Sequence, residues 1–153
     1  MQTFYEALMD RFEELHREVL KSLDELPSEA LDWKPGPDMN SLSVLITHLS
    51  GAERFWVGDV ARGESSHRNR DAEFQVHGLS AETLKQRIRD LEAYEKGSFE
   101  KMGMSKLEEI RKLEDGREYS VSWALTHALE HTALHVGHIQ MLNELWQQRQ
   151  TKE

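Results

Sequence analysis

The sequence predicts an all-α protein folded as an antiparallel four-helix bundle. Large apolar residues recur at steps of three and four along several stretches, proline and glycine separate these stretches, and a histidine-rich run also has helical spacing. With 153 residues, the chain is long enough to bury a core and fits one domain, 1-153. Four helices of roughly 20 residues bury their apolar faces by packing around one another.

The first predicted helix spans residues 3 to 26. Its apolar positions form one stripe, made of Phe4, Leu8, Phe12, Leu15, Val19, Leu23 and Leu26. Pro27 and the "PGP" at residues 35 to 37 cannot continue the helix, because proline lacks the amide donor and disfavours a helical conformation in the residue before it. The chain must therefore turn between this helix and the next.

The second predicted helix starts with Asn40 or Ser41 as its cap and stops near Gly63. Its inward residues are Leu45, His48, Leu49, Ala52, Phe55 and Trp56. Residues 64 to 78 are polar and show no sustained period. We expect them to form a long loop between the second and third helices, of a length unusual for a bundle.

The second half of the chain predicts two further helices separated by a hairpin. The third helix follows a cap at Ser80 and frays after Gly97, and its inward positions are Ala81, Leu84, Ile88, Leu91 and Tyr94. Between residues 103 and 119, Asp115-Gly116 is a turn signal between alternating segments, which predicts a short hairpin. The fourth helix runs from about Ser120 to Gln148.

Composition excludes several classes of function. The chain has no cysteine, so any metal site must use histidine and carboxylate ligands. Its net charge is −9 and it has no basic run, which argues against nucleic-acid binding. No window of about 18 apolar residues is present and the N-terminal segment is amphipathic and acidic, so we expect no membrane span, no secretion signal and a cytoplasmic protein.

The stretch from Thr126 to Leu142 holds four of the eight histidines of the chain. His127, His131 and His135 are each four residues apart and share one helical face, and His138 stays close to it. Two imidazoles at positions i and i+4 can direct nitrogens at one metal ion. Spacing alone does not choose between the pair His127 and His131 and the pair His131 and His135.

A third ligand must come from another element, and His48 is the natural donor because it lies in the inward stripe of the second helix. A single inward histidine is more often a hydrogen-bonded core residue than a ligand. Several buried imidazoles without a shared partner would cost about 1 to 3 kcal/mol each, which favours a metal. Three protein ligands leave one position open, as in catalytic zinc sites. Glu53, about a turn beyond His48, either supports this site or is solvated.

A di-iron centre is the competing metal interpretation. Glu13-x-x-His16 resembles half of such a motif. That chemistry needs two such pairs and two further carboxylates on facing helices, and no second pair lies on a predicted helix. We therefore expect no di-iron site.

Two segments resemble the DinB/YfiT superfamily of bacterial four-helix bundles, and the similarity spans essentially the whole chain. They are "LDWKPGPDMNSLSVLITHLSGAERFW" and "WALTHALEHTALHVGHIQML". In that family a histidine on helix two and a His-x-x-x-His pair on helix four bind a divalent metal, often nickel or zinc. The resemblance thus implies His48, His131 and His135 as ligands, with His127 as a companion one turn earlier. Together with Glu53, near His48, and His138, near His135, we expect His127 to support the ligands or to line the substrate pocket.

The resemblance also implies a class of activity. Characterised members are metal-dependent transferases that join low-molecular-weight thiols, such as bacillithiol or mycothiol, to electrophiles, or isomerases that depend on such a thiol. We therefore expect an S-transferase acting on a small-molecule substrate in stress response or detoxification, with the sulfur supplied by a thiol cosubstrate. A non-catalytic metal-binding bundle with a structural or interaction role, and a metal-dependent hydrolase, are the alternatives. A homodimer is expected from the family and from surplus apolar residues such as Trp146 and Val57.

Overall fold

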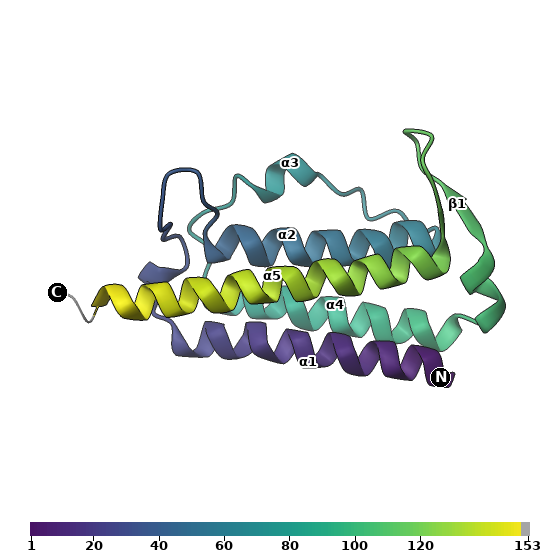
Figure 1. Cartoon of the computed structure of the whole chain (residues 1–153), viewed down its shortest axis with the longest axis horizontal. Helices are drawn as coiled ribbons and strands as arrows, with labels where there is room; N and C mark the ends of the chain where they lie inside the picture. Colours follow the sequence, from purple (N-terminus) through teal and green to yellow (C-terminus); the bar gives the residue numbers. More distant parts are fainter. Residues whose placement is uncertain (151–153) are drawn as a thin grey trace.

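The computed structural model describes residues 1–150, and within them four long helices form a bundle (Figure 1). The long helices are α1 (Thr3–Glu25), α2 (Leu42–Arg54), α4 (Ala81–Lys101) and α5 (Val121–Gln150). The shorter elements are η1 (Ser28–Ala30), η2 (Phe55–Arg62), α3 (Arg70–Glu73), η3 (Met104–Glu108), β1 (Ile110–Lys112) and β2 (Glu118–Ser120). The predicted all-α four-helix bundle is confirmed.

The connection between η2 and α4 decides the topology of the bundle. It runs back along the bundle and carries α3 over the outer side of α2, so that α2 and α4 point in the same direction, opposite to α1 and α5 (Figure 1). The long loop predicted there contains one helical turn, α3, whose N-terminus is capped by Asn69 Oδ1 accepting from the Ala72 N–H at 3.1 Å. A single turn is too short to show a period in the sequence. Because the connection passes over the outer side of α2, α2 lies between the α3 segment and α5 (Figure 1).

The second helix starts and ends where the sequence predicts, but it changes from an α-helix to a π-helix along its length. Ser41 caps α2 by accepting from the Val44 N–H at 3.3 Å. From Phe55 the helix continues as the π-helical segment η2 and ends at Gly63, whose φ of 73° suits a residue without a Cβ. π-helical segments occur often at functional sites.

The third long helix is longer than the sequence predicted. The expected end after Gly97 is wrong, because Ser98 and Phe99 are buried and α4 continues to Lys101. The Phe99 ring stacks on Tyr5 and Phe12, with ring centroids 5.7 and 6.4 Å away. Burial of one aromatic ring thus outweighs the helix-breaking tendency of a glycine.

The predicted hairpin before the last helix is present. Strands β1 and β2 pair antiparallel with Ile110 opposite Ser120, and Gly116 in the turn has a φ of 87°. The hairpin extends from the end of the bundle where α1 begins (Figure 1).

The buried apolar residues of the described chain fall into two clusters, one toward each end of the bundle. One cluster includes Val19, Leu49 and Val136, and the other includes Phe12, Trp56 and Ala128. The polar residues described below lie between them.

The structure also bears on the expected dimer and on the expected absence of a membrane span. Trp146 and Val57, whose apolar character suggested a dimer, are 7% and 0% exposed within the bundle's own core, so they give no support to a second copy. Within residues 1–150, no helix has the length and apolar character needed to cross a membrane.

Candidate metal centre

The antiparallel packing of α2 against α5 brings three predicted ligands together. The Nε2 atom of His131 lies 3.2 Å from Nε2 of His48 and 3.2 Å from Nε2 of His135. One nitrogen from each ring falls within 4.8 Å of the others. Ligand nitrogens about 2.0 to 2.1 Å from a tetrahedral ion are about 3.3 Å apart, so these separations suit an ion held between the rings.

The electrostatic environment keeps two of these rings neutral. Burial lowers the pKa of His131 to about 4, and the nearby rings of His135 and His48 add to the effect. Burial likewise lowers the pKa of His135 to about 4. The Nδ1 atoms of both rings are buried, and no residue of the described chain forms a hydrogen bond with them. Neutral imidazoles are suited to sharing a divalent cation through Nε2.

A carboxylate from the crossover connection orients the third ring. Glu73 Oε2 lies 2.9 Å from His48 Nδ1, and Arg68 donates to the same carboxylate at 2.6 and 2.8 Å. Burial raises the pKa of Glu73, but the hydrogen bonds from Arg68 and His48 outweigh it and hold the pKa below its ordinary value. An ionised Glu73 accepts a hydrogen bond from the Nδ1–H of His48 and leaves the Nε2 lone pair of His48 directed at the other two rings.

Glu73 was missed by the sequence analysis, which placed it in an irregular polar loop. Its partner His48 is 25 residues away and no periodic pattern connects the two. A local signal exists in Gly51, where a Cβ would stand 2.2 Å from Glu73 Oε1. A glycine in mid-helix often marks such a close approach.

His127 lies outside the group of three. Its ring centroid is 6.0 Å from that of His131, and the ring stacks on Trp123 at 4.7 Å with its edge toward Trp56 at 4.9 Å. Tyr119 continues the stack, 4.2 Å from Trp123. We call Trp56, Tyr119, Trp123 and His127 the aromatic wall. The wall flanks the candidate metal centre on the side of His131.

Of the other two residues predicted to support the metal centre, His138 lies beside it and Glu53 does not. The His138 ring is exposed and its centroid is 5.4 Å from that of His135. Glu53 is fully buried and bonds to His16 and Thr132. Five residues turn an α-helix by about 140° beyond a full turn, so Glu53 points into the bundle interior toward His16 and Thr132, whereas His48 points toward His131 and His135.

Glu53 belongs to a second polar cluster inside the bundle. His16 Nε2 is 2.7 Å from Glu53 Oε1, and His16 Nδ1 is 3.2 Å from Glu92 Oε1. Ligand atoms of His16, Glu53 and Glu95 lie within 4.8 Å of one another, and all three side chains are 0% exposed. The sequence suggests His16 as a ligand only through the Glu13-x-x-His16 pattern, and Glu92 and Glu95 were not predicted as site residues.

Charges in this buried cluster are strongly coupled. Burial lowers the pKa of His16, but the charge and hydrogen bonds of Glu53 and Glu92 outweigh it and raise the pKa to about 9. Burial raises the pKa of Glu53, and the facing charge of His16 reverses this and lowers the pKa. Burial and the neighbouring Glu53 charge raise the pKa of Glu95 well above its ordinary value. Without a cation, the cluster therefore holds a charged histidine, one carboxylate and one carboxylic acid.

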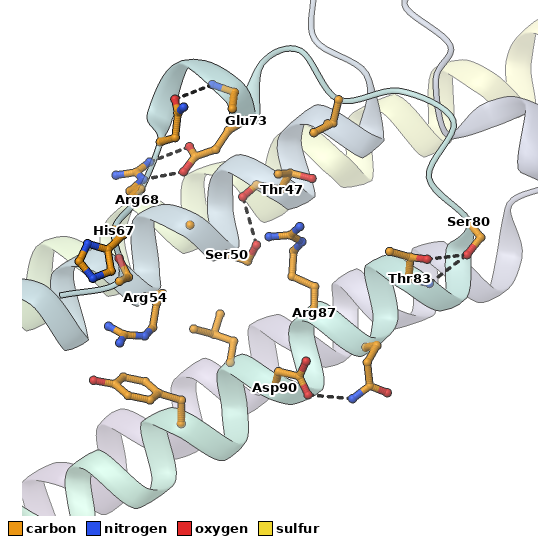
Figure 2. Close-up of a pocket in the computed structure, with 18 of the residues that line it drawn as sticks. Thr47, Ser50, Arg54, His67, Arg68, Glu73, Ser80, Thr83, Arg87 and Asp90 are labelled. Atoms are coloured by element: carbon orange, nitrogen blue, oxygen red, sulfur yellow. Dashed lines mark hydrogen bonds and ion pairs between the residues drawn. The ribbon is translucent and has the colours of Figure 1, made fainter. Parts of the chain in front are cut away.

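A cavity of about 1080 Å³ lies between α2, the crossover connection and α4 (Figure 2). Arg54 from α2 and Arg87 from α4 extend into it, and the Arg68–Glu73 pair forms its outer wall (Figure 2). A ligand in this cavity would touch the carboxylate that orients His48.

Comparisons with known proteins agree with this architecture. The chain matches the family model described as mycothiol-S-transferase over residues 7–148. A comparison with curated proteins finds no match.

Several solved structures share the fold. A DinB-like protein from Bacillus cereus ATCC 10987 has a TM-score of 0.75 and 19% identity, covering 92% of this chain and 91% of that one. YfiT from Bacillus subtilis, described as a probable metal-dependent hydrolase with an unusual four-helix bundle topology, has a TM-score of 0.74 and 10% identity, covering 95% and 90%. A mycothiol-dependent maleylpyruvate isomerase has a TM-score of 0.65 and 15% identity, covering 89% of this chain and 62% of that one. At these identities the likeness shows the fold alone.

Proposed function

Since the chain belongs to the mycothiol S-transferase family of DinB/YfiT-like proteins, we propose that it is a divalent-metal-dependent enzyme that transfers a low-molecular-weight thiol to an electrophile. The proposed ligands are His48, His131 and His135. The convergence of their three Nε2 atoms, with separations of 3.2 Å, is the observation that carries the proposal. Nickel or zinc is the proposed ion, since imidazole nitrogen suits both.

The residues of the chain divide the chemical work. A divalent ion, when bound, lowers the pKa of a thiol and holds the resulting thiolate beside its reaction partner. Three neutral imidazoles leave one position open for that sulfur. Glu73 keeps His48 in the tautomer that ligates. Because the chain has no cysteine, the sulfur must come from a cosubstrate such as mycothiol or bacillithiol.

The aromatic wall gives the electrophile a place to lie. Trp123 is 41% exposed, whereas Trp56 behind it is 9% exposed, so the wall presents an accessible apolar face beside His131. Flat aromatic rings bind apolar groups and exclude water from one side of the reacting atoms. We therefore place the electrophile against Trp123 and His127.

The test combines metal analysis with thiol consumption. Protein purified without a histidine tag is analysed for bound metal and then assayed with a panel of thiols and electrophiles. We expect metal-dependent thiol consumption that is lost in His48→Ala, His131→Ala and His135→Ala, and retained in the control His77→Ala, an exposed histidine of the crossover connection.

Each contrary result has a distinct meaning. A ligand variant with full metal occupancy removes that residue from the site. Chelator-sensitive melting without thiol consumption across the panel indicates a non-catalytic metal-binding bundle. Chelator-sensitive hydrolysis of the electrophile without thiol indicates a hydrolase, because the same ion can activate water.

We also propose a homodimer, which would cover exposed apolar side chains on α5. Leu134 and Met141 are 57% and 61% exposed and lie seven residues apart, on one face of the helix. Light scattering coupled to size-exclusion chromatography measures the mass directly. A monomer at high concentration contradicts this part of the proposal.

A further inference from the structure

The long helices of the described chain each place one polar side chain in the same buried layer. The four residues are His16, Glu53, Glu95 and Thr132, and each is 0% exposed. Each also sits between buried apolar residues one turn away: Phe12 and Val19 around His16, Leu49 and Trp56 around Glu53, Leu91 and Phe99 around Glu95, and Ala128 and Val136 around Thr132. The layer therefore interrupts the apolar core of each long helix at one level. Buried polar groups of this kind are costly unless their hydrogen bonds are fully satisfied.

Hydrogen bonding satisfies only part of this layer. His16 contacts Glu53 and Glu92, and the Thr132 hydroxyl donates to Glu53 Oε2. In contrast, neither oxygen of Glu95 accepts a hydrogen bond from any residue of the described chain. Its carboxyl group lies within 4.8 Å of the ligand atoms of His16 and Glu53, and it can pair with Glu53 only while it is protonated. Once Glu95 is ionised, two buried carboxylates face each other, an arrangement that a bound cation would stabilise.

We propose that His16, Glu53 and Glu95 form a second binding site, for a divalent first-row transition metal ion, distinct from the three-histidine centre. One imidazole nitrogen and two carboxylate oxygens are a ligand set that zinc, cobalt, manganese and iron accept. A neutral imidazole and two carboxylates carry a charge of about −2, which a divalent ion balances inside the core. Core metal sites built from side chains on facing helices are an established use of the four-helix bundle.

The residues around the proposed ligands would hold them in position. Glu92 accepts from His16 Nδ1, which leaves Nε2 as the ligating nitrogen. Thr132 occupies Oε2 of Glu53 and leaves Oε1 toward His16 and the ion. The ion would therefore replace the proton that His16 Nε2 now shares with Glu53.

A route to the site lies between α1 and α4. The Glu92 side chain is 29% exposed while its partner His16 is 0% exposed, so the cluster is one side chain away from solvent. Since binding displaces protons from His16 and Glu95, affinity should rise with pH.

Cobalt provides a direct test, because it can be counted and its visible absorption reports on its ligands. Full-length protein is stripped with a chelator, titrated with Co²⁺ at pH 8 and analysed for bound metal. We expect two equivalents in the unmodified chain, one in His131→Ala/His135→Ala, and none when Glu95→Gln is added to that double variant. Glu100→Gln, an exposed carboxylate on the same helix, is the matched control and should keep the bound equivalent.

The single variant Glu95→Gln guards against a double variant that does not fold. In the otherwise unmodified chain, it should lower the stoichiometry from two to one, with helix content unchanged by circular dichroism. Two results would overturn the proposal. In one, Glu95→Gln leaves the number of bound Co²⁺ ions unchanged. In the other, the unmodified chain binds a single equivalent of Co²⁺, and this equivalent disappears in His131→Ala/His135→Ala.

Discussion

The carboxylate of Glu73 lies 2.9 Å from Nδ1 of His48, a contact that joins the crossover connection to the candidate metal centre. Arg68 donates hydrogen bonds to both oxygens of the same carboxylate. The connection between α2 and α4 is therefore part of the proposed site, and its conformation decides how the His48 ring is presented to α5. This relationship makes the crossover testable through metal affinity.

Removal of Glu73 should weaken the metal centre without removing a ligand. We expect Glu73→Ala to lower metal affinity by about 10- to 100-fold, because His48 loses the acceptor that fixes its tautomer and orientation. Competition with a chromophoric chelator measures the change. Asp71→Asn, an exposed carboxylate in the same helical turn, is the control and should leave affinity unchanged. Equal affinities for Glu73→Ala and the parent would remove Glu73 from the site.

Gly51 offers a second route to the same contact. A Cβ at this position would stand 2.2 Å from Oε1 and 2.9 Å from Cδ of Glu73, so Gly51→Ala should displace Glu73 from His48. We expect a loss of metal affinity similar to that of Glu73→Ala. The free energy of unfolding should change less, because the displaced atoms are the end of a flexible side chain and alanine gains about 0.5 to 1 kcal/mol of helix propensity over glycine.

Gly137 is the matched control for that substitution, since a Cβ there meets nothing within 4 Å. Gly137→Ala should raise stability by about 0.5 to 1 kcal/mol through helix propensity alone, with metal affinity unchanged. Urea unfolding and chelator competition on the two variants give both quantities. If Gly51→Ala and Gly137→Ala had the same metal affinity, the close approach of Glu73 to Gly51 would not be required for metal binding.

The histidines predict how the stability of the metal-free protein depends on pH. The pKa of His16 is raised from 6.5 to about 9, so its stabilising contribution is present below pH 6.5 and is lost as pH rises to 9. The pKa values of His131 and His135 are lowered from 6.5 to about 4, so their contribution is present above pH 6.5 and is lost as pH falls to 4. As far as these groups are concerned, stability should peak near pH 6.5.

Urea unfolding midpoints between pH 4 and 9.5, measured in a chelator, test this dependence. His16→Gln should remove the loss of stability between pH 6.5 and 9. In the unmodified chain this loss of unfolding free energy is about 3 kcal/mol, at about 1.36 kcal/mol per pKa unit. His131→Ala/His135→Ala should flatten the acid side. An alkaline side that is equally steep with and without His16 would contradict the charge assigned to the buried cluster.

His127 should influence the substrate and not the metal. Its ring is part of the aromatic wall and its centroid is 6.0 Å from that of His131, so we expect His127→Ala to keep full metal content while the KM for an aromatic or alkyl electrophile rises. Loss of one stacking contact is worth about 0.5 to 1.5 kcal/mol, or roughly 2- to 12-fold. Thr126→Ala, the exposed neighbour, is the control. Loss of metal from His127→Ala would instead make this ring a ligand.

Part of the proposed centre follows from sequence spacing. His131 and His135 share a face because four residues make slightly more than one helical turn, and His48 falls on the apolar stripe of its own helix. The choice between His127 and His135 did not follow from spacing. It depends on where α2 crosses α5. In the structure, Nε2 of His48 lies 3.2 Å from Nε2 of His131, and the His48 ring also packs against the ring of His135.

The buried layer leaves a weak signal in the sequence. Each of its members interrupts an apolar stripe at helical spacing, as Glu95 does between Leu91 and Phe99. An isolated glutamate on a helix is most often solvated, so the pattern on one helix carries little information. Only the coincidence of such interruptions at one level of all the long helices reveals the cluster.

The sequence by itself determined the long helices to within a few residues, the breaks between them and the histidine pair on α5, because these depend on the periodicity and conformational preferences of residues close together in the chain. The tertiary structure decided which side chains meet across helices: Glu73 with His48, and His16 with Glu53 and Glu95. Such meetings depend on the rotation and axial offset of each helix, and these are set by the packing of the whole core.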